Sequence, residues 1–414
     1  MELGKYSIGI GDRFGRQGKA QLEAVMRMKS LGVDVSPVWN KSHREHRLVG
    51  SGPSDTRKEA DEAVRGLRWR GPYFVDADHV GMKNVDLFIA DSDFFTIDVA
   101  DFIGKSADSR SASLFAERHA DLTGRLDIPG IPEGIQVTEA RIHEIAEKYL
   151  YAVREAGRIF RHVADQRKGK PFVVEISMDE TAEPQTPVEL LFVLAAIADE
   201  GIPARTVAPK FTGRFNKGVD YVGDVRRFVR EFEEDLAVVA FAAREFQMSP
   251  DLKLSVHSGS DKFALYGPMN ASLKKFKAGL HLKTAGTTWL EEVIGLAEAG
   301  GDGLDIARTL YREALSRFDE LCKPYAAVID IDPRKLPAPD QVDGWDGRRL
   351  ASTLRHDPSN PEYNPHFRQL IHVGYKIAAE MGERYLDALD KHSGVIARNV
   401  TENLFERHLK RVFL

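Results

Sequence analysis

Apolar and polar positions follow two repeating patterns along the chain. Short runs rich in β-branched and aromatic residues predict eight strands, at residues 6–10, 33–39, 73–79, 94–99, 172–177, 205–211, 252–257 and 280–283. Most are followed by a segment in which apolar residues recur at helical spacing. Strands that alternate with helices pair in parallel through right-handed crossovers. The sequence therefore predicts an α/β fold, a (β/α)8 TIM-like barrel.

Two regions interrupt this alternation. Roughly seventy residues separate the fourth strand from the fifth, which predicts an insertion at about 104–170. Beyond about residue 330 the alternation stops, and a connection rich in Pro, Asp and Gly leads to two predicted helices, 366–390 and 396–412. We therefore expect a catalytic barrel over residues 1–330 and a C-terminal helical extension over 331–414 that packs on it.

Composition and charge narrow the class of protein. Of 414 residues, 43% are hydrophobic and 29% charged, as in compact proteins with a substantial core. The net charge of -5 argues against a nucleic-acid partner. The longest apolar run is too short to cross a membrane, and the N-terminus lacks the order of a signal peptide. The single cysteine, Cys322, is compatible with a reducing cytosol, so we expect a cytoplasmic protein.

Polar residues accumulate near the C-terminal ends of the predicted strands, where such barrels carry their catalytic groups. His79 and His257 end the third and seventh strands, and His281 lies in the eighth. Imidazole and carboxylate ligands together suit Zn, Mn, Co, Ni or Fe, and the sequence does not choose among these ions. We predict that His79, His257 and His281 bind one divalent metal ion. The alternative for each histidine is a hydrogen-bonded imidazole in the core.

Two carboxylates are candidates for proton transfer. Asp78 stands beside His79 at a strand end, which suits a general acid/base, although it could instead cap the next turn. Glu175 interrupts an apolar strand. Burying it unpaired would be costly, so it is expected to meet a cation or to hold a proton. We predict Asp78 and Glu175 as catalytic residues. A metal ligand or a structural ion pair stays open for Glu175.

Cationic side chains at the strand ends suit a substrate that carries a carboxylate, because Arg offers a planar fork and Lys a point charge. Several lie in the loop 209–218, directly after a strand. The Ser-Gly-Ser turn after His257 would let a substrate oxygen approach the backbone. The predicted substrate-binding residues are Lys41, Lys210, Arg214, Asn216, Lys217, Ser258, Ser260, Asp261, Lys262, Lys283 and Thr284.

Nucleotide and hydrolase signatures are missing. Gly9-Ile-Gly11 begins like a dinucleotide fingerprint, but Phe14 occupies the position of the required third glycine. The sequence contains neither a P-loop nor a Gly-x-Ser-x-Gly elbow. We therefore expect no nucleotide cofactor.

Longer segments carry a more specific signal. They are WNKS (39–42), PYFVDADH (72–79), DSDFFTIDVAD (91–101), PKFTGRFNKGVDY (209–221), HSGSDKF (257–263) and HLKTAGTTWLE (281–291). Together they resemble the tagaturonate/fructuronate epimerase family over nearly the whole chain. A more distant similarity, through Asp78-His79 and through His257, is to metal-dependent class II aldolases. The family resemblance implies a divalent metal and a ketouronate substrate.

The chemistry that the resemblance implies is an inversion at C4, a carbon β to the ketone whose hydrogen is not acidic. Inversion there needs either transient oxidation or cleavage of the C3–C4 bond, and the missing nucleotide fingerprint disfavours oxidation. We expect retro-aldol cleavage and re-formation assisted by a Lewis-acidic metal. The alternatives are a class II-type aldolase, an aldose–ketose isomerase and a non-catalytic sugar-acid binding protein. The oligomeric state stays open.

Overall fold

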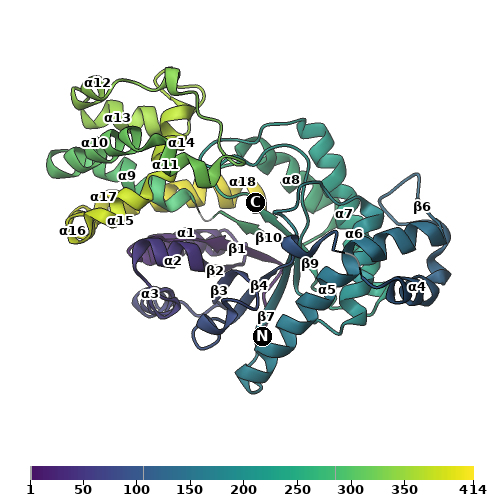
Figure 1. Cartoon of the computed structure of the whole chain (residues 1–414). Helices are drawn as coiled ribbons and strands as arrows, with labels where there is room; N and C mark the ends of the chain where they lie inside the picture. The colour runs from purple at the N-terminus through teal and green to yellow at the C-terminus, as the bar shows by residue number, and fades with distance from the viewer. Residues whose placement is uncertain (1, 106, 285) are drawn as a thin grey trace.

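The computed structural model describes residues 2–105, 107–284 and 286–414, and its centre is a closed barrel of eight parallel strands (Figure 1). Around the barrel the strand order is β1-β10-β9-β8-β7-β4-β3-β2. The strands are β1 (Tyr6–Ile10), β2 (Val35–Ser42), β3 (Phe74–Val80), β4 (Phe94–Asp98), β7 (Val173–Ser177), β8 (Thr206–Ala208), β9 (Lys253–His257) and β10 (Leu280–Lys283). Each of the eight predicted strands corresponds to one of these, which confirms the (β/α)8 fold.

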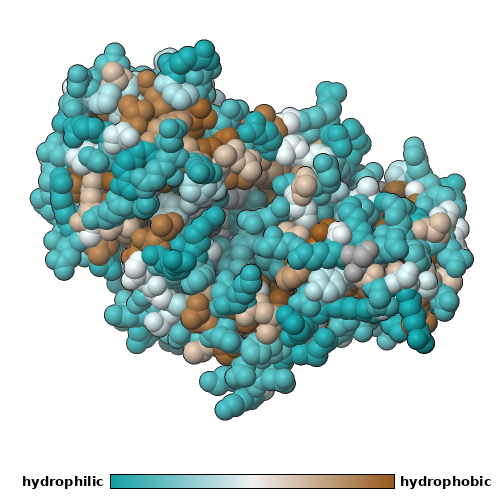
Figure 2. All heavy atoms as spheres, viewed as in Figure 1, coloured by the Kyte–Doolittle hydropathy of each residue, from teal (hydrophilic) through white to brown (hydrophobic). Residues whose placement is uncertain are grey.

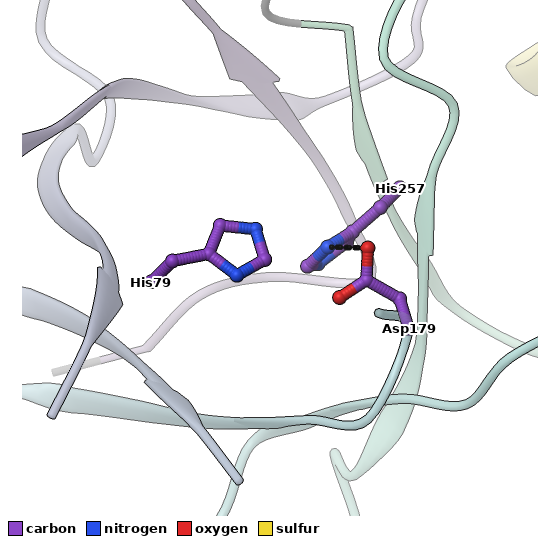
Figure 3. A group of neighbouring side chains, drawn as sticks. All are labelled: His79, Asp179 and His257. Carbon is purple, nitrogen blue, oxygen red and sulfur yellow. Dashed lines mark ion pairs between the residues drawn. The ribbon is translucent and has the colours of Figure 1, made fainter. Parts of the chain in front are cut away.

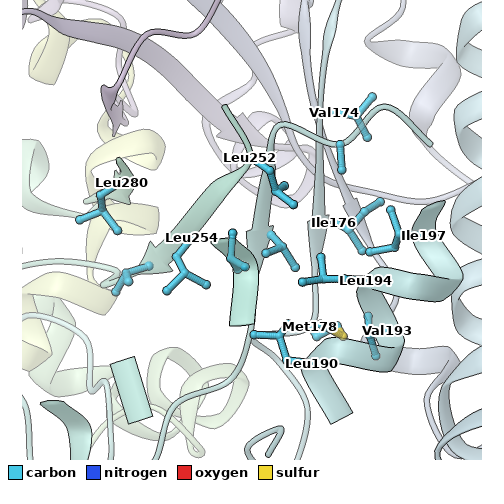
Figure 4. Packing of buried hydrophobic residues seen from close by; sticks show 14 of the residues in the cluster. Val174, Ile176, Met178, Leu190, Val193, Leu194, Ile197, Leu252, Leu254 and Leu280 are labelled. Atoms are coloured by element: carbon cyan, nitrogen blue, oxygen red, sulfur yellow. The ribbon is translucent and has the colours of Figure 1, made fainter. Parts of the chain in front are cut away.

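Helices outside the barrel cover its strands. They are α1 (Gly18–Ser30), α2 (His43–Val49), α3 (Pro53–Gly66), α5 (Glu139–Arg167), α6 (Pro187–Asp199), α7 (Val225–Glu245) and α8 (Phe263–Phe276). Helix α6 begins with a capping box, in which Thr186 accepts from the Glu189 amide and Glu189 accepts from the Thr186 amide. Figure 4 shows Leu190 and Leu194 of this helix packed against Ile176 and its neighbours in and after β7. Because the barrel strands are buried on both faces, their sequences are nearly continuous hydrophobic runs.

The segment between β4 and β7 contains additional elements, as the sequence predicts. Helix α4 (Ser109–Arg118) is followed by an antiparallel hairpin of β5 (Gly124–Leu126) and β6 (Ile135–Val137). The 29-residue helix α5 then returns to the barrel and packs on α4 and α6. One residue of the predicted insertion, 106, lies outside the described residues.

The C-terminal third of the chain adds a helical layer beside α1 (Figure 1). Its helices are α9 (Thr287–Ala299), α10 (Gly301–Ser316), α11 (Phe318–Cys322), α12 (Pro339–Asp343), α13 (Gly347–Leu354), α14 (Pro365–Val373), α15 (Tyr375–Met381), α16 (Glu383–Lys391) and α17 (Ser393–Glu402). A π-helical segment, Asn403–Leu409, and α18 (Lys410–Phe413) follow. Helices α9 to α17 share a hydrophobic cluster that extends from Trp289 to Val400 and also contains Ala20 of α1, whereas the π-helical segment and α18 pack into the cluster of the barrel. On the viewed face the surface is hollowed between this layer and the rest of the molecule, with hydrophilic residues around the hollow (Figure 2).

The first of the two long C-terminal helices predicted from the sequence, 366–390, is broken into α14, α15 and α16, whereas the second, 396–412, is helical throughout and contains the π-helical segment. Gly374 ends α14, and Gly382, with φ of 57°, separates α15 from α16. A positive φ costs glycine little and ends a helix readily. Periodicity alone did not reveal these breaks because the apolar spacing continues across them. The division into a barrel over 1–330 and an extension over 331–414 stays a prediction.

Among the described residues, no helix is both long enough and apolar enough to span a bilayer.

Candidate metal and acid/base site

A bulge at the end of β3 directs His79 toward the barrel axis. The pairing register between β3 and β4 shifts between Ala77 and Val80, and His79 has φ of 52°. Bulges of this kind re-aim a side chain and are frequent beside active sites. A non-glycine residue in the left-handed region costs about 1–3 kcal/mol, which the surrounding fold must offset. The sequence pattern could not predict this conformation, because it depends on the neighbouring strand.

His79 meets His257, at the end of β9, and Asp179, just beyond β7 (Figure 3). One ligand atom from each of these three residues lies within 4.8 Å of the other two. The two imidazole rings are 5.3 Å apart at 83°, and His257 Nδ1 is 3.0 Å from Asp179 Oδ2. Asp179 was not predicted from the sequence, although its position two residues after a strand end was a usable signal.

The second nitrogen of each imidazole is held by another carboxylate. His79 Nδ1 is 3.1 Å from Asp98 Oδ2, and His257 Nε2 is 2.8 Å from Glu175 Oε1. These contacts orient both rings and leave His79 Nε2 and His257 Nδ1 for other partners. Carboxylates that orient histidines in this way are typical of metal-binding imidazoles.

Electrostatics within this group favour charged imidazoles when no cation is bound. Burial lowers the pKa of His257, but Asp179 and Glu175 outweigh burial and raise that pKa to about 9. Burial likewise lowers the pKa of His79, and Asp78 and Asp98 raise it above its ordinary value. Burial raises the pKa of Asp179, yet the two imidazoles hold it far below its usual range. The negative charge of the surrounding carboxylates can therefore be balanced either by protons on the two imidazoles or by a bound cation.

Lys283 lies at the centre of a buried carboxylate cluster next to the histidines. Its Nζ is 2.8 Å from Asp76 Oδ2, 2.8 Å from Asp78 Oδ1 and 3.1 Å from Glu175 Oε1. Asp78 Oδ1 is also 3.8 Å from His79 Nε2, so Asp78 connects the two groups. The two groups together contain five predicted residues, and they add Asp76, which was not predicted. The five are Asp78, His79, Glu175, His257 and Lys283.

The members of this cluster titrate differently. Burial lowers the pKa of Lys283, but Asp76, Asp78 and Glu175 raise it well above its ordinary value. Burial raises the pKa of Asp76 to about 6 despite the attraction of Lys283. For Asp78 and Glu175 burial acts in the same direction, but Lys283 and the histidines prevail and lower both pKa values, that of Asp78 to about 2. Lys283 is therefore charged, and Asp78 can accept a proton.

His281 lies apart from the other two predicted metal ligands. It precedes Lys283 by two residues in β10, is fully buried, and its Nδ1 is 2.9 Å from the Ser7 hydroxyl. Burial, together with Lys283, lowers the pKa of His281 to about 3 although Glu175 opposes this. The imidazole is therefore neutral and packs beside Phe94. Its Nε2 has no hydrogen-bond partner among the described residues, and its assignment as a metal ligand stays a prediction.

Several predicted substrate-binding residues contact the protein's own backbone. Lys262 Nζ donates to the carbonyls of Asn216 (3.0 Å) and Val219 (2.8 Å), and Ser260 accepts from the Gly218 amide. Further such bonds join Ser258 to the Lys283 carbonyl, Thr284 to the Gly9 carbonyl and Lys41 to the Arg13 carbonyl. These bonds join neighbouring strand-end loops, and substrate binding by these residues stays a prediction.

Asp261 is the centre of a buried polar cluster that joins the barrel to the C-terminal helices. Arg368 Nη2 is 2.8 Å from Asp261 Oδ2, and His356 and His408 are each 3.2 Å from its carboxylate. Arg368 also donates to the Gly218 and Leu354 carbonyls. Burial raises the pKa of Asp261, but the charge of Arg368 and the hydrogen bonds from His356 and His408 hold it well below its usual range. The carboxylate therefore has structural partners.

The three cations of the loop after β8 lie in different surroundings. Arg214 Nη1 is 3.4 Å from Asp330 at the exposed edge. Lys210 is partly buried, and its amide donates to Gln185. Lys217 is partly buried beside Arg13 and Arg44, and burial together with these two cations lowers its pKa. Lys217 is therefore the member of the loop that adds to a concentration of positive charge.

Comparison with known proteins agrees with this architecture. A family model described as tagaturonate epimerase matches residues 1–411. The tagaturonate/fructuronate epimerase of Thermotoga maritima is 29% identical over 420 residues, covering 97% of this chain and 80% of that protein. A glycerol-complexed crystal structure of fructuronate-tagaturonate epimerase from Cohnella laeviribosi superposes with a TM-score of 0.81 at 22% identity, covering 100% of this chain and 82% of that one. The crystal structure supports the fold, and the family match over almost the full length shows that the chain belongs to the tagaturonate epimerase family.

Proposed function

We propose that this protein interconverts D-tagaturonate and D-fructuronate by inverting C4, with a divalent cation held by His79, Asp179 and His257. The observation that carries the proposal is the convergence of two carboxylate-oriented imidazoles on one carboxylate. Family membership supplies the reaction class, an epimerisation.

The side chains of His79, Asp179 and His257 form a suitable donor set for a cation. His257 Nδ1 is buried and 3.0 Å from Asp179, yet it makes no hydrogen bond of acceptable geometry within the described residues. A buried polar atom without such a bond calls for another partner. Two nitrogens and one carboxylate oxygen suit Zn, Mn, Co, Ni or Fe. A cation bound there would supply Lewis-acid stabilisation of negative charge on the sugar's ketone and the adjacent hydroxyl.

Asp78 is the proposed acid/base for the bond-breaking step. Its carboxylate takes the proton of the C4 hydroxyl as the C3–C4 bond breaks. The bonding electrons pass to C3 of the three-carbon ketone fragment, and C4 becomes the aldehyde carbon of a three-carbon acid. After the aldehyde turns by about half a turn, C3 attacks its other face and the C4 oxygen regains a proton. Lys283 holds Asp78 in place from 2.8 Å.

For Glu175 the proposed role is the structural alternative rather than the catalytic one. It is fully buried, and its carboxylate accepts from Thr206 and contacts both His257 and Lys283. We propose that Glu175 orients His257 and balances the charge of Lys283. Because three carboxylates keep Lys283 protonated, Lys283 is a poor nucleophile, and the alternative of cleavage through a lysine Schiff base is disfavoured.

Turnover of D-tagaturonate by metal-loaded enzyme in heavy water, followed by NMR, tests the reaction. We expect D-fructuronate that keeps hydrogen at C4, because this hydrogen travels with the aldehyde fragment and never reaches solvent. Asp78→Asn should lower turnover by about a hundredfold or more, the scale of losing an acid/base group, and should still bind metal.

Other outcomes point to the alternatives. Accumulated three-carbon fragments would identify an aldolase, and an aldose product an aldose–ketose isomerase. Substantial deuterium at C4, or an absolute need for a nicotinamide cofactor, would contradict inversion by C–C cleavage.

A further inference from the structure

A group of cations near the reacting residues has too few carboxylate partners. Arg13 is 3.3 Å from Glu45, whereas Arg44 and Lys217 form no ion pair with any described residue. Burial and the neighbouring cations lower the pKa of Lys217, so these positive groups affect one another. Unbalanced positive charge in a partly buried place favours the binding of an anion.

Two tyrosines from the C-terminal layer hold these cations in position. Arg44 and Lys217 lie over the ring of Tyr325, at 5.2 and 5.7 Å from its centroid, and Arg13 lies 3.9 Å from that of Tyr375. The two tyrosine hydroxyls are 3.0 Å apart. Cation–π contacts restrain the side chains without neutralising their charge. Arg44, Tyr325 and Tyr375 also line a neighbouring cavity of about 440 Å3, to whose lining neither Arg13 nor Lys217 belongs.

The cation group adjoins the reaction centre. Glu45 is 3.3 Å from Arg13 and accepts from the Ser42 amide, and Ser42 is paired with Asp78 across β2 and β3, so Glu45 lies near both the cations and Asp78. Glu180 acts on the pKa of Lys217 and is also grouped with His79 and Asp98. A substrate at the metal site can therefore extend toward Lys217.

A buried histidine beside this group also lacks a partner. His372 is 1% exposed, and neither of its ring nitrogens has a hydrogen-bond partner among the described residues. Burial, Arg13 and Lys217 lower its pKa, so the imidazole is neutral. A β-carbon at Gly286 would lie 2.4 Å from His372 Nε2. Only glycine therefore lets the backbone at this position approach the imidazole ring so closely. Unpaired buried polar atoms are rare and indicate an unseen water or ligand.

We propose that Arg13, Arg44 and Lys217, held by Tyr325 and Tyr375, bind the carboxylate of the substrate and so select sugar acids over neutral ketohexoses. This inference rests on the proposed function for the identity of the substrate. It also gives the C-terminal layer a role in specificity, because both tyrosines belong to that layer. Arg13 was not in the substrate-binding set predicted from the sequence.

Calorimetric binding to the metal-loaded enzyme, which needs no turnover, tests the pocket with D-tagaturonate and with neutral D-tagatose. Arg44→Met and Lys217→Met should each weaken tagaturonate binding about 10- to 100-fold, the scale of one charge-assisted hydrogen bond. Binding of tagatose should change less than about threefold. Arg16→Met removes a charge from the same rim, and because Arg16 is already paired with Asp390 this control should bind both sugars like the wild type.

Equal weakening for both sugars, or unchanged tagaturonate binding in both variants, would overturn the pocket assignment. Thermal melts of the variants check that they fold, and Arg44 is exposed enough to be replaced without a core defect. If the variants weaken tagaturonate binding as expected but the wild type does not epimerise tagaturonate, the carboxylate-binding assignment is retained and the proposed reaction is wrong. The two hypotheses are therefore separable.

Discussion

Removing Arg368 should reveal how strongly the barrel depends on the C-terminal helices. The guanidinium and the Asp261 carboxylate are both fully buried, 2.8 Å apart, and Arg368 also donates to two backbone carbonyls. Arg368→Met would leave the buried Asp261 carboxylate without its main positive partner. Such a loss lowers the free energy of unfolding by about 3–5 kcal/mol. An unfolding entropy of about 2.1 cal/mol/K per residue over 414 residues then gives a fall in Tm of roughly 3–6 °C.

Scanning calorimetry at a fixed scan rate measures this fall. The control is Arg227→Met, which breaks a solvent-exposed ion pair with Glu231 at 3.0 Å and should lower Tm by about 1 °C or less. The double variant Asp261→Asn/Arg368→Met removes the stranded charge as well, so it should lose less stability than the sum of the two single variants. A Tm for Arg368→Met equal to that of the control, or strict additivity in the double variant, would refute the reasoning.

The remaining predictions concern the metal site and one close approach. Asp179→Asn should bind less than about a tenth of the metal retained by the wild type after dialysis, measured by mass spectrometry, because a charged ligand is lost. His281→Asn should retain its metal, and the opposite pattern would transfer the ligand role to His281. Glu175→Gln should weaken metal affinity about 10- to 100-fold in competition with a chelator, and unchanged affinity would argue against an orienting role. Gly286→Ala should destabilise by about 1–3 kcal/mol in thermal melts, because its β-carbon would lie 2.6 Å from a backbone oxygen. Gly267→Ala, inside α8 with open space around it, should be neutral or stabilising, so equal effects would argue against the clash.

The sequence alone determined the barrel and the strand ends that form the candidate site. Strand positions were predictable because each strand is a short apolar run between polar turns, a pattern that burial on both faces requires. The polar ends of those strands identified Asp78, His79, Glu175 and His257, since parallel strands bring their C-terminal ends to one rim. The strand positions and the polar residues at strand ends are local features of the sequence, so they can be recognised without knowing which strands are neighbours.

Only the tertiary structure decided which polar groups meet. His281 lies in a strand like His257, but its position two residues before Lys283 directs it to Ser7 below the rim. Asp179 joins the histidines because the turn after β7 brings it there. Its position two residues after the strand made it a candidate, but only the structure shows which groups it meets. Asp261, a strand-end carboxylate by sequence, is instead bound by Arg368, more than a hundred residues later. Such assignments depend on side-chain direction and on contacts between distant segments, which only the closed barrel and its helical layer define.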